Sequence, residues 1–568
     1  MASSGNDPSA ARGLKRKHDG NAPRLTPSQR LAAARWAGIE TRVNPAQLGD
    51  DDHSMATAAG PPMAARDVDG DKGSATPSTK KAPRDDGYYE RLYASELDFE
   101  VWGKRMGISV LCKRFSVVIL PERLTAGKHL DFTDPAAIMQ LTKTLLKRDF
   151  SLQIELTDDR LCPPVPNRHN YILWLKSLLD TSSPTYVEAY EPERQVTGVD
   201  VGTGASAIYP LLGCAQRPAW SFVATDIDAK SLACARRNVA LNGLEARIRV
   251  VERDDSSAAL IPLDESDTQQ IDFVMTNPPF YESEAELQQL AAQKALPPAS
   301  ACTGAPHEMV CEGGELGFLQ RLLDESLVLR ERVQWYTAML GKQSSLGAVV
   351  DRLRAKGIDN YAVAQFVQGH KTRRWAVGWS FGARRPAGRA CRGGGVSSLL
   401  TDGSGGKSLL PPVTEMTVAS RTVRTAAAAS QLENTFWTQL EDVTDGLDLV
   451  AWSLDEERLR GVGFTDGNKR RATTTVPGKG KDGEGEKNMN KEDGPIVVDR
   501  IRTKKESAEC SFGFSVSIQT RGKQSTEGAP VQEVAAVVRW LQGRDFGLFE
   551  SFCGMLRNGF VAVAAGSS

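Results

Sequence analysis

The sequence predicts an α/β protein whose central element is a seven-stranded, mostly parallel sheet covered by helices on both faces. The main observation is that short apolar runs alternate with helix-like segments between residues 195 and 381, which is typical of a parallel sheet with helical crossovers. The last two runs, 361–366 and 374–381, are separated by only a few residues. A connection this short cannot cross over the sheet, so we expect the final strand to run antiparallel.

Composition limits the class of protein. The chain has 568 residues, enough for more than one domain, and its 40% hydrophobic and 25% charged content is typical of a soluble globular protein. It contains neither an apolar run of membrane-spanning length nor a secretory signal at its N-terminus, so we expect an intracellular protein without a membrane partner. The nine cysteines show no C-x-x-C spacing, and we expect no metal site. The net charge of −1 does not by itself indicate nucleic-acid binding.

The chain divides into ordered and low-complexity stretches. Ordered sequence begins near Tyr88, after a segment rich in Ala, Ser, Pro, Gly and Asp that we expect to be disordered. Near the C-terminus a small α+β domain is predicted, with a strand at 511–519 and a helix at 531–557. The predicted boundaries are a disordered tail at 1–85, an N-terminal module at 86–190, the sheet domain at 191–383, a low-complexity linker at 384–430, and the C-terminal domain at 431–463 and 496–565 around a disordered loop at 464–495.

The end of the first predicted strand carries the sequence VDVGTG at 199–204. Glycines such as Gly202 and Gly204 let the backbone approach a nucleotide-like ligand without an intervening Cβ. Asp226 closes the next strand, where its carboxylate can accept hydrogen bonds from ribose hydroxyls. The pattern alone is not specific, because a nicotinamide enzyme shows a related turn and a purely structural turn is also possible.

A second motif, Asn277-Pro278-Pro279-Phe280, follows directly on the apolar run IDFVMT. It therefore lies at the carboxyl end of a strand, where open α/β sheets bind ligands. The lone pair of an aromatic amine such as adenine N6 is delocalised into the ring, so the amine is a weak nucleophile. The Asn277 amide oxygen and the Pro278 carbonyl can accept its two N–H bonds, and the prolines preorganise these acceptors. Phe280 can stack on a base that has left its helix.

Several segments together resemble the methyltransferase-like 16 family: GTGASAIYPLLG, NPPFY, EGGELGFLQRLLDESL, WYTAMLGK and RRWAVGWSF. That family comprises N6-adenosine methyltransferases of U6 small nuclear RNA, with bacterial relatives that act on ribosomal RNA. The resemblance runs from about residue 88 to 381. It implies a Rossmann-like class I methyltransferase domain, an N-terminal RNA-binding module, S-adenosylmethionine as cofactor, and structured RNA as partner, with U6 small nuclear RNA favoured.

The resemblance also implies individual roles. Arg168 would reach the methionine carboxylate of the cofactor. Ser257 stands where a threonine is expected, in a loop whose acidic residues depart from the basic loop of the family, so a regulatory role for this loop stays open. The implied cofactor-binding residues are Arg168, Gly202, Gly204, Asp226, Ser257 and Asn277. The RNA-binding candidates are Tyr281, Lys371, Arg373 and Arg374, with Lys147, Arg148 and Arg160 extending the path, although solvated charged surfaces look the same.

Three questions stay open: the function, the location in the cell, and the role of the segment 312–315. Related Asn/Asp-Pro-Pro-aromatic motifs serve ribosomal RNA, DNA and protein methyltransferases, and the chain could also be an RNA-binding scaffold with secondary catalysis. The basic cluster at 15–18 and the C-terminal extension favour a nuclear enzyme, with the cytoplasm as a second location. The segment 312–315, EGGE, opens a helix, and its glycines allow either loop movement or helix capping. No protein partner is predicted.

Overall fold

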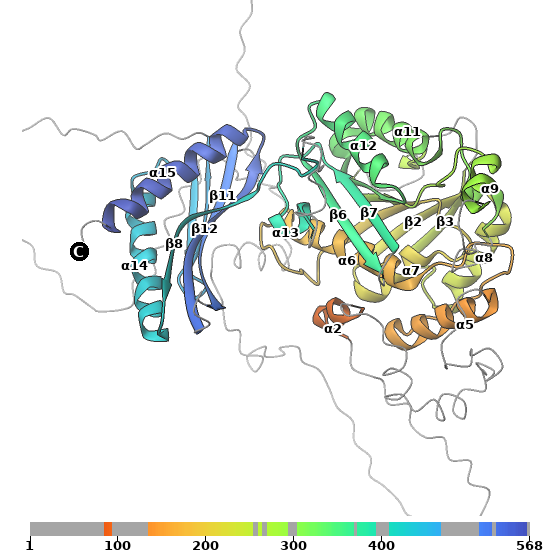
Figure 1. Ribbon diagram of the computed structural model, residues 1–568, viewed down its shortest axis with the longest axis horizontal. Helices are drawn as coiled ribbons and strands as arrows, with labels where there is room; N and C mark the ends of the chain where they lie inside the picture. The colour runs from red at the N-terminus through yellow and green to blue at the C-terminus, as the bar shows by residue number, and fades with distance from the viewer. Residues whose placement is uncertain are drawn as a thin grey trace, which may run out of the picture. The chain divides into compact units, whose positions relative to one another are not determined.

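The structure is a computed structural model (Figure 1). It describes residues 84–93, 134–253, 259–263, 270–292, 304–368, 372–393, 408–466, 510–524 and 530–564. The expected tail and the expected loop at 464–495 lie almost entirely outside the described residues. Among the described residues, no helix combines the length and apolarity needed to cross a membrane.

The first sheet has seven strands in the order β3-β2-β1-β4-β5-β7-β6. All neighbouring pairs are parallel except those of β7, which runs antiparallel to both β5 and β6. The predicted seven-stranded, mostly parallel sheet and its antiparallel final strand are therefore confirmed. The strands are β1 (Val196–Val201), β2 (Trp220–Asp226), β3 (Ile248–Glu252), β4 (Ile271–Thr276), β5 (Val333–Leu340), β6 (Tyr361–Gln368) and β7 (Thr372–Trp379).

Helices cover this sheet on both faces (Figure 1), because alternate strand residues point to opposite sides. Phe273 packs with α6, α7 and α8 in one apolar cluster, whereas its neighbour Val274 packs with α11 and α12 in another. The helices are α6 (Val165–Thr181), α7 (Ile208–Gln216), α8 (Ala229–Leu241), α9 (Glu284–Ala292), α10 (Pro306–Met309), α11 (Gly314–Leu329), α12 (Gln343–Ala355) and α13 (Gly388–Cys391), with a 3-10 turn at Arg330–Arg332.

The described part of the N-terminal module packs on the first of these two clusters. Besides α6, which also falls within 86–190, it contains α2 (Asp86–Arg91), α5 (Pro135–Leu145) and a π-helical turn at Leu146–Phe150. Leu145, Leu146 and Phe150 join the same apolar cluster as residues of α6 and α7. These helices therefore share the core of the sheet domain.

The second sheet has five antiparallel strands in the order β8-β12-β11-β10-β9. Helices α14 and α15 lie on the same face of this sheet (Figure 1) and pack with it around a separate apolar cluster that includes Phe514, Trp540 and Phe552. The elements are β8 (Glu415–Val423), α14 (Ala426–Asp445), β9 (Ala451–Asp455), β10 (Arg460–Thr465), β11 (Phe512–Gln524), β12 (Pro530–Gly543) and α15 (Phe546–Ala564).

Two expectations for this region were wrong. The helix predicted at 531–557 begins only at Phe546, and the preceding residues form β12. This strand pairs on both sides, with β11 and β8, and its valines suit a buried central strand. The linker predicted at 384–430 contains α13, β8 and the start of α14. Its Gly- and Ser-rich part, at 394–407, lies outside the described residues.

Candidate active site

A cavity of about 720 Å³ opens at the carboxyl ends of β1, β2 and β4. This volume is in the usual range for small-molecule sites, and the position is where open α/β sheets bind ligands. The residues expected from the sequence that line it are Arg168, Gly202, Gly204, Asp226, Asn277, Pro278 and Pro279. Ser257 lies outside the described residues.

The Gly turn, residues 202–204, forms one wall of the cavity. Gly202 and Gly204 have φ values of +76° and +64°, which side chains rarely adopt. The Gly202 and Thr203 amides both donate to the Thr225 carbonyl, at 2.9 and 2.8 Å. The Gly204 amide donates to Asp226 Oδ2 at 2.8 Å, so the acidic end of β2 holds the turn directly. A Cβ at Gly202 would meet no protein atom within 4 Å, which leaves room for a ligand against the backbone.

Asp200, the penultimate residue of β1, is a polar residue that was assigned no role from the sequence. Its side chain is fully buried, and neither carboxylate oxygen has a hydrogen-bond partner among the described residues. Burial raises the pKa of Asp200 to about 7. The nearby Thr203 hydroxyl opposes the shift without forming a hydrogen bond of ordinary geometry, and the Arg168 guanidinium opposes it too. Buried polar atoms of this kind usually have a water or ligand partner.

Arg168 and Asn277, predicted for different ends of the site, contact each other. Arg168 is 6% exposed, and its Nη1 donates to Asn277 Oδ1 at 3.0 Å. Since a guanidinium only donates, this contact fixes the orientation of the amide, with its oxygen toward Arg168. The Arg168 guanidinium also lies 5.4 Å from the centre of the Tyr209 ring, and its Nε has no partner among the described residues.

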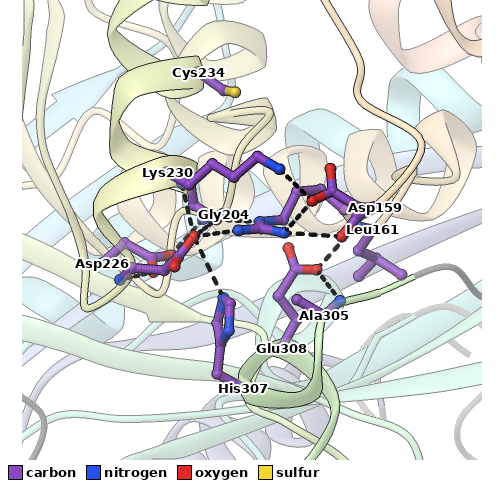
Figure 2. A network of polar contacts seen from close by, with 12 residues as sticks. Asp159, Leu161, Gly204, Asp226, Lys230, Cys234, Ala305, His307 and Glu308 are labelled. Carbon is purple, nitrogen blue, oxygen red and sulfur yellow. Dashed lines mark hydrogen bonds and ion pairs between the residues drawn. The ribbon is translucent and has the colours of Figure 1, made fainter.

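A strap, residues 304–312, borders the cavity opposite the Gly turn. The Tyr281 amide donates to the Met309 carbonyl, and the Cys311 amide donates to the Tyr281 carbonyl, both at 3.0 Å. Figure 2 shows Glu308 between two backbone donors, the amides of Leu161 at 3.0 Å and Ala305 at 2.8 Å. A Cβ at Gly204 would lie 3.5 Å from Glu308 Oε1, so the carboxylate faces the Gly turn. Burial raises the pKa of Glu308.

Asp228, the N-cap residue of α8, links the strap to the segment before α6. Its Oδ2 accepts from Arg160 Nη2 at 2.7 Å and lies 3.8 Å from His307 Nε2. Partial burial alone would raise the pKa of Asp228, but hydrogen bonds from Arg160 and Ser231 outweigh it and lower the pKa to about 2. Arg160 is 9% exposed and bonded in this cluster. The expectation that it extends an RNA path is therefore wrong.

Phe280 and the RNA-binding candidates lie beyond the cavity. Phe280 is partly exposed, and the Arg374 guanidinium carbon lies 5.6 Å from the centre of its ring. Tyr281 pairs with Val310 of the strap, and Arg373 is exposed on β7. Lys371 lies outside the described residues. Within the described part of the chain, no group of three or more His, Cys, Asp or Glu side chains is placed to hold a metal ion.

Sequence reasoning missed the contribution of Asp200, His307, Glu308 and Arg321, of which the last three line the cavity. A carboxylate between two valines near the end of a predicted strand was a signal for Asp200. The strap residues follow a segment outside the described residues, and nothing in their pattern indicates a cavity wall.

Comparison with known proteins shows which family the chain resembles. A family model described as RNA methyltransferase matches residues 115–383. The U6 small nuclear RNA (adenine-(43)-N(6))-methyltransferase of Schizosaccharomyces pombe is 44% identical over 48% of this chain and 67% of its own length. The Drosophila melanogaster protein of the same name is 35% identical over 45% of this chain and 83% of its own.

The RNA N(6)-adenosine-methyltransferase mettl16 of Danio rerio is 41% identical over 45% of this chain. The match spans only 52% of that protein, about half its length. The region that the family model matches, 115–383, contains the Gly turn, the Asn-Pro-Pro-Phe motif and the strap. The chain belongs to the methyltransferase-like 16 family of RNA methyltransferases.

Proposed function

We propose that this methyltransferase transfers a methyl group from S-adenosylmethionine to the N6 amine of an adenosine in structured RNA, and that its substrate is U6 small nuclear RNA. The observation that carries the reaction is the Asn277 amide, held at the edge of the cavity with its oxygen toward Arg168. The relatives named for U6 RNA, at 44% and 35% identity, support the substrate.

The polar groups around the cavity fit S-adenosylmethionine, which supplies an electrophilic methyl group when bound. The unpaired carboxylate of Asp200 suits the ammonium group of its methionine part, directly or through a water. Arg168 has an unpaired Nε and suits the carboxylate. Asp226 keeps acceptor capacity for ribose hydroxyls beyond its bonds to the Gly204 and Asp228 amides.

The Asn-Pro-Pro-Phe loop would prepare the RNA base. Asn277 Oδ1 and the Pro278 carbonyl accept the two N–H bonds of adenine N6, which favours a more tetrahedral nitrogen with an available lone pair. Arg168 supports this role because its bond orients the Asn277 amide. Phe280 stacks on the base after it has left its helix or loop. These groups require no strong base, since the amine loses its proton after the transfer.

The RNA backbone would be held by basic residues of β7 and the adjoining turn. Arg373 and Arg374 support this assignment by their position next to Phe280, and Lys371 and Tyr281 are further candidates. A U6 small nuclear RNA substrate supports a nuclear location for the enzyme.

The test uses the full chain, tritiated cofactor and a panel of U6 RNA, ribosomal RNA fragments and an unrelated hairpin, with nucleoside analysis of the product. We expect label as N6-methyladenosine in U6 RNA only. Label on ribosomal RNA would instead assign the substrate class of the bacterial relatives. Absence of label on every RNA would reject RNA methylation and leave DNA, protein or a scaffold role.

A further inference from the structure

Glu315 is a buried carboxylate that lies outside the cofactor cavity. It stands in the first turn of α11 and is 2% exposed. Its Oε2 accepts from the Gly341 amide at 2.8 Å, and its Oε1 accepts from the Lys342 amide at 3.2 Å. Burying a carboxylate is costly unless both oxygens are satisfied, so this pair of bonds strongly specifies the turn between β5 and α12.

The turn held by Glu315 forms a wall against Phe280. A Cβ at Gly341 would lie 2.8 Å from Phe280 Cδ1 and 3.0 Å from Cε1, so the ring already rests against the glycine. Real Cβ atoms do not approach ring carbons this closely. The Arg374 guanidinium carbon lies 5.6 Å from the centre of the same ring. Phe280 is thus confined by residues from the end of β5 and the start of β7.

The glycines of the EGGE segment bring Glu315 to this place. Gly313 and Gly314 have φ values of +68° and +59°. A Cβ at Gly314 would lie 3.1 Å from Glu282 Cγ and 3.5 Å from the Phe280 carbonyl oxygen. The start of α11 therefore packs directly on the chain that follows Phe280. Close packing explains these glycines, without any loop movement.

We propose that Glu315 is a positioning residue for base recognition, because it fixes the Gly341–Lys342 turn that holds the Phe280 ring in place. The inference rests on the proposed stacking role of Phe280. Phosphate contacts dominate RNA affinity, so a misplaced ring lowers the fraction of bound RNA whose base is presented correctly. The effect therefore falls on kcat and leaves the KM for RNA and the cofactor affinity nearly unchanged.

Two substitutions reach Phe280 from different sides. Glu315→Gln turns an amide NH2 toward one of the two backbone N–H groups, so the turn loses a bond. Gly341→Ala leaves Glu315 intact but puts a methyl group where the ring lies. We expect each to lower kcat about tenfold, with the cofactor Kd and the KM for RNA within about twofold of the unchanged protein.

Two matched controls separate this role from general stability. Glu286→Gln removes an exposed ion pair to Lys342, at 3.0 Å, on the same turn. Gly347→Ala adds a methyl group in α12 where the nearest atom would be 3.9 Å away. Both controls should keep kcat within about twofold, because exposed pairs contribute little and the added methyl has room.

The decisive measurement is single-turnover methylation of U6 RNA by Gly341→Ala in a Phe280→Ala background. If the methyl group acts through the ring, the double variant is no slower than Phe280→Ala alone. A further tenfold loss in the double variant, or a normal kcat for both Glu315→Gln and Gly341→Ala, overturns the proposal. Should Glu315→Gln fail to fold, the comparison of Gly341→Ala with and without Phe280→Ala still shows whether the Gly341–Lys342 turn acts through the Phe280 ring. The unchanged protein serves as the reference for all of these rates. If it does not methylate U6 RNA, the proposed function fails; if it does and the variants do not behave as expected, only the role of Glu315 fails.

Discussion

The Gly turn and the strap enclose the same cavity but are held in different ways. The Gly turn is fixed by backbone hydrogen bonds to the end of the neighbouring strand β2. Its glycines can adopt the positive φ values that this turn requires. The strap is fixed by Glu308, which accepts from the Leu161 amide 147 residues away in sequence, by the approach of His307 to Asp228, and by pairing with Tyr281. The comparison teaches that a local motif can define one wall of a site while a distant contact defines the other.

The comparison predicts that changes at the strand ends affect chemistry and cofactor binding severely. Changes in the strap should loosen the site without abolishing its function. Four substitutions test this, from the largest expected effect to the smallest.

Asn277→Ala should lower kcat on RNA by about a thousandfold, because it removes a preorganised acceptor for the N6 amine. RNA affinity should change little, since phosphate contacts dominate it. Single-turnover kinetics with U6 RNA measures the first quantity and filter binding the second. Turnover within tenfold of the unchanged protein would remove Asn277 from the chemistry.

Asp226→Ala should weaken cofactor binding about a hundredfold, because the substitution removes the proposed ribose acceptor and the bond to the Gly204 amide. Calorimetric titration with S-adenosylhomocysteine provides the Kd without turnover. An unchanged Kd would contradict the ribose assignment and show that backbone bonds alone hold the Gly turn.

Asp200→Asn should stabilise the cofactor-free protein at pH 8. The folded pKa is raised from 3.8 to about 7, so the folded state prefers the protonated form. The stability contributed by this group is fully present below pH 3.8 and is lost as the pH rises through 7. Replacing the carboxylate should therefore recover about 4 kcal/mol above pH 7 and little near pH 4. Melting curves across this range measure the gain, and an equal gain at both pH values would refute the ionisation argument.

Glu308→Ala should weaken cofactor binding about fivefold, an effect of about 1 kcal/mol, because it removes the one oxygen, Oε2, that accepts from both the Leu161 and the Ala305 amides. Limited proteolysis should also cut the strap faster. If the loss of affinity matches that of Asp226→Ala, the proposed difference between the two walls disappears.

Local patterns predicted most of the first sheet. The alternation of apolar runs with helical segments determined the strands, and the short final connection determined the direction of β7. The Gly turn and the Asn-Pro-Pro-Phe loop were placed at the correct sheet edge, because glycine and proline restrict the backbone wherever they occur. Their chemical roles remain predictions.

Features that depend on distant partners were not predictable. β12 was assigned to a helix because its Val- and Ala-rich run has no clear period, and only pairing with β8 and β11 makes it a strand. Arg160 looked like a surface cation, but Asp228 and Ser231 of α8 bury it. The EGGE segment at 312–315 was interpreted as a movable loop or a helix cap, and nothing local indicated that the Glu315 carboxylate accepts from the Gly341 and Lys342 amides.

The second sheet suggests a use for the chain in the laboratory. Thr465 of β10 and Phe512 of β11 are register partners, so β10 ends next to the start of β11. Lengthening a closed connection costs little, about 0.6 kcal/mol for each doubling. A fluorescent protein or an affinity tag inserted near residue 488 would therefore report on the intact enzyme while both chain ends and the catalytic sheet stay unmodified.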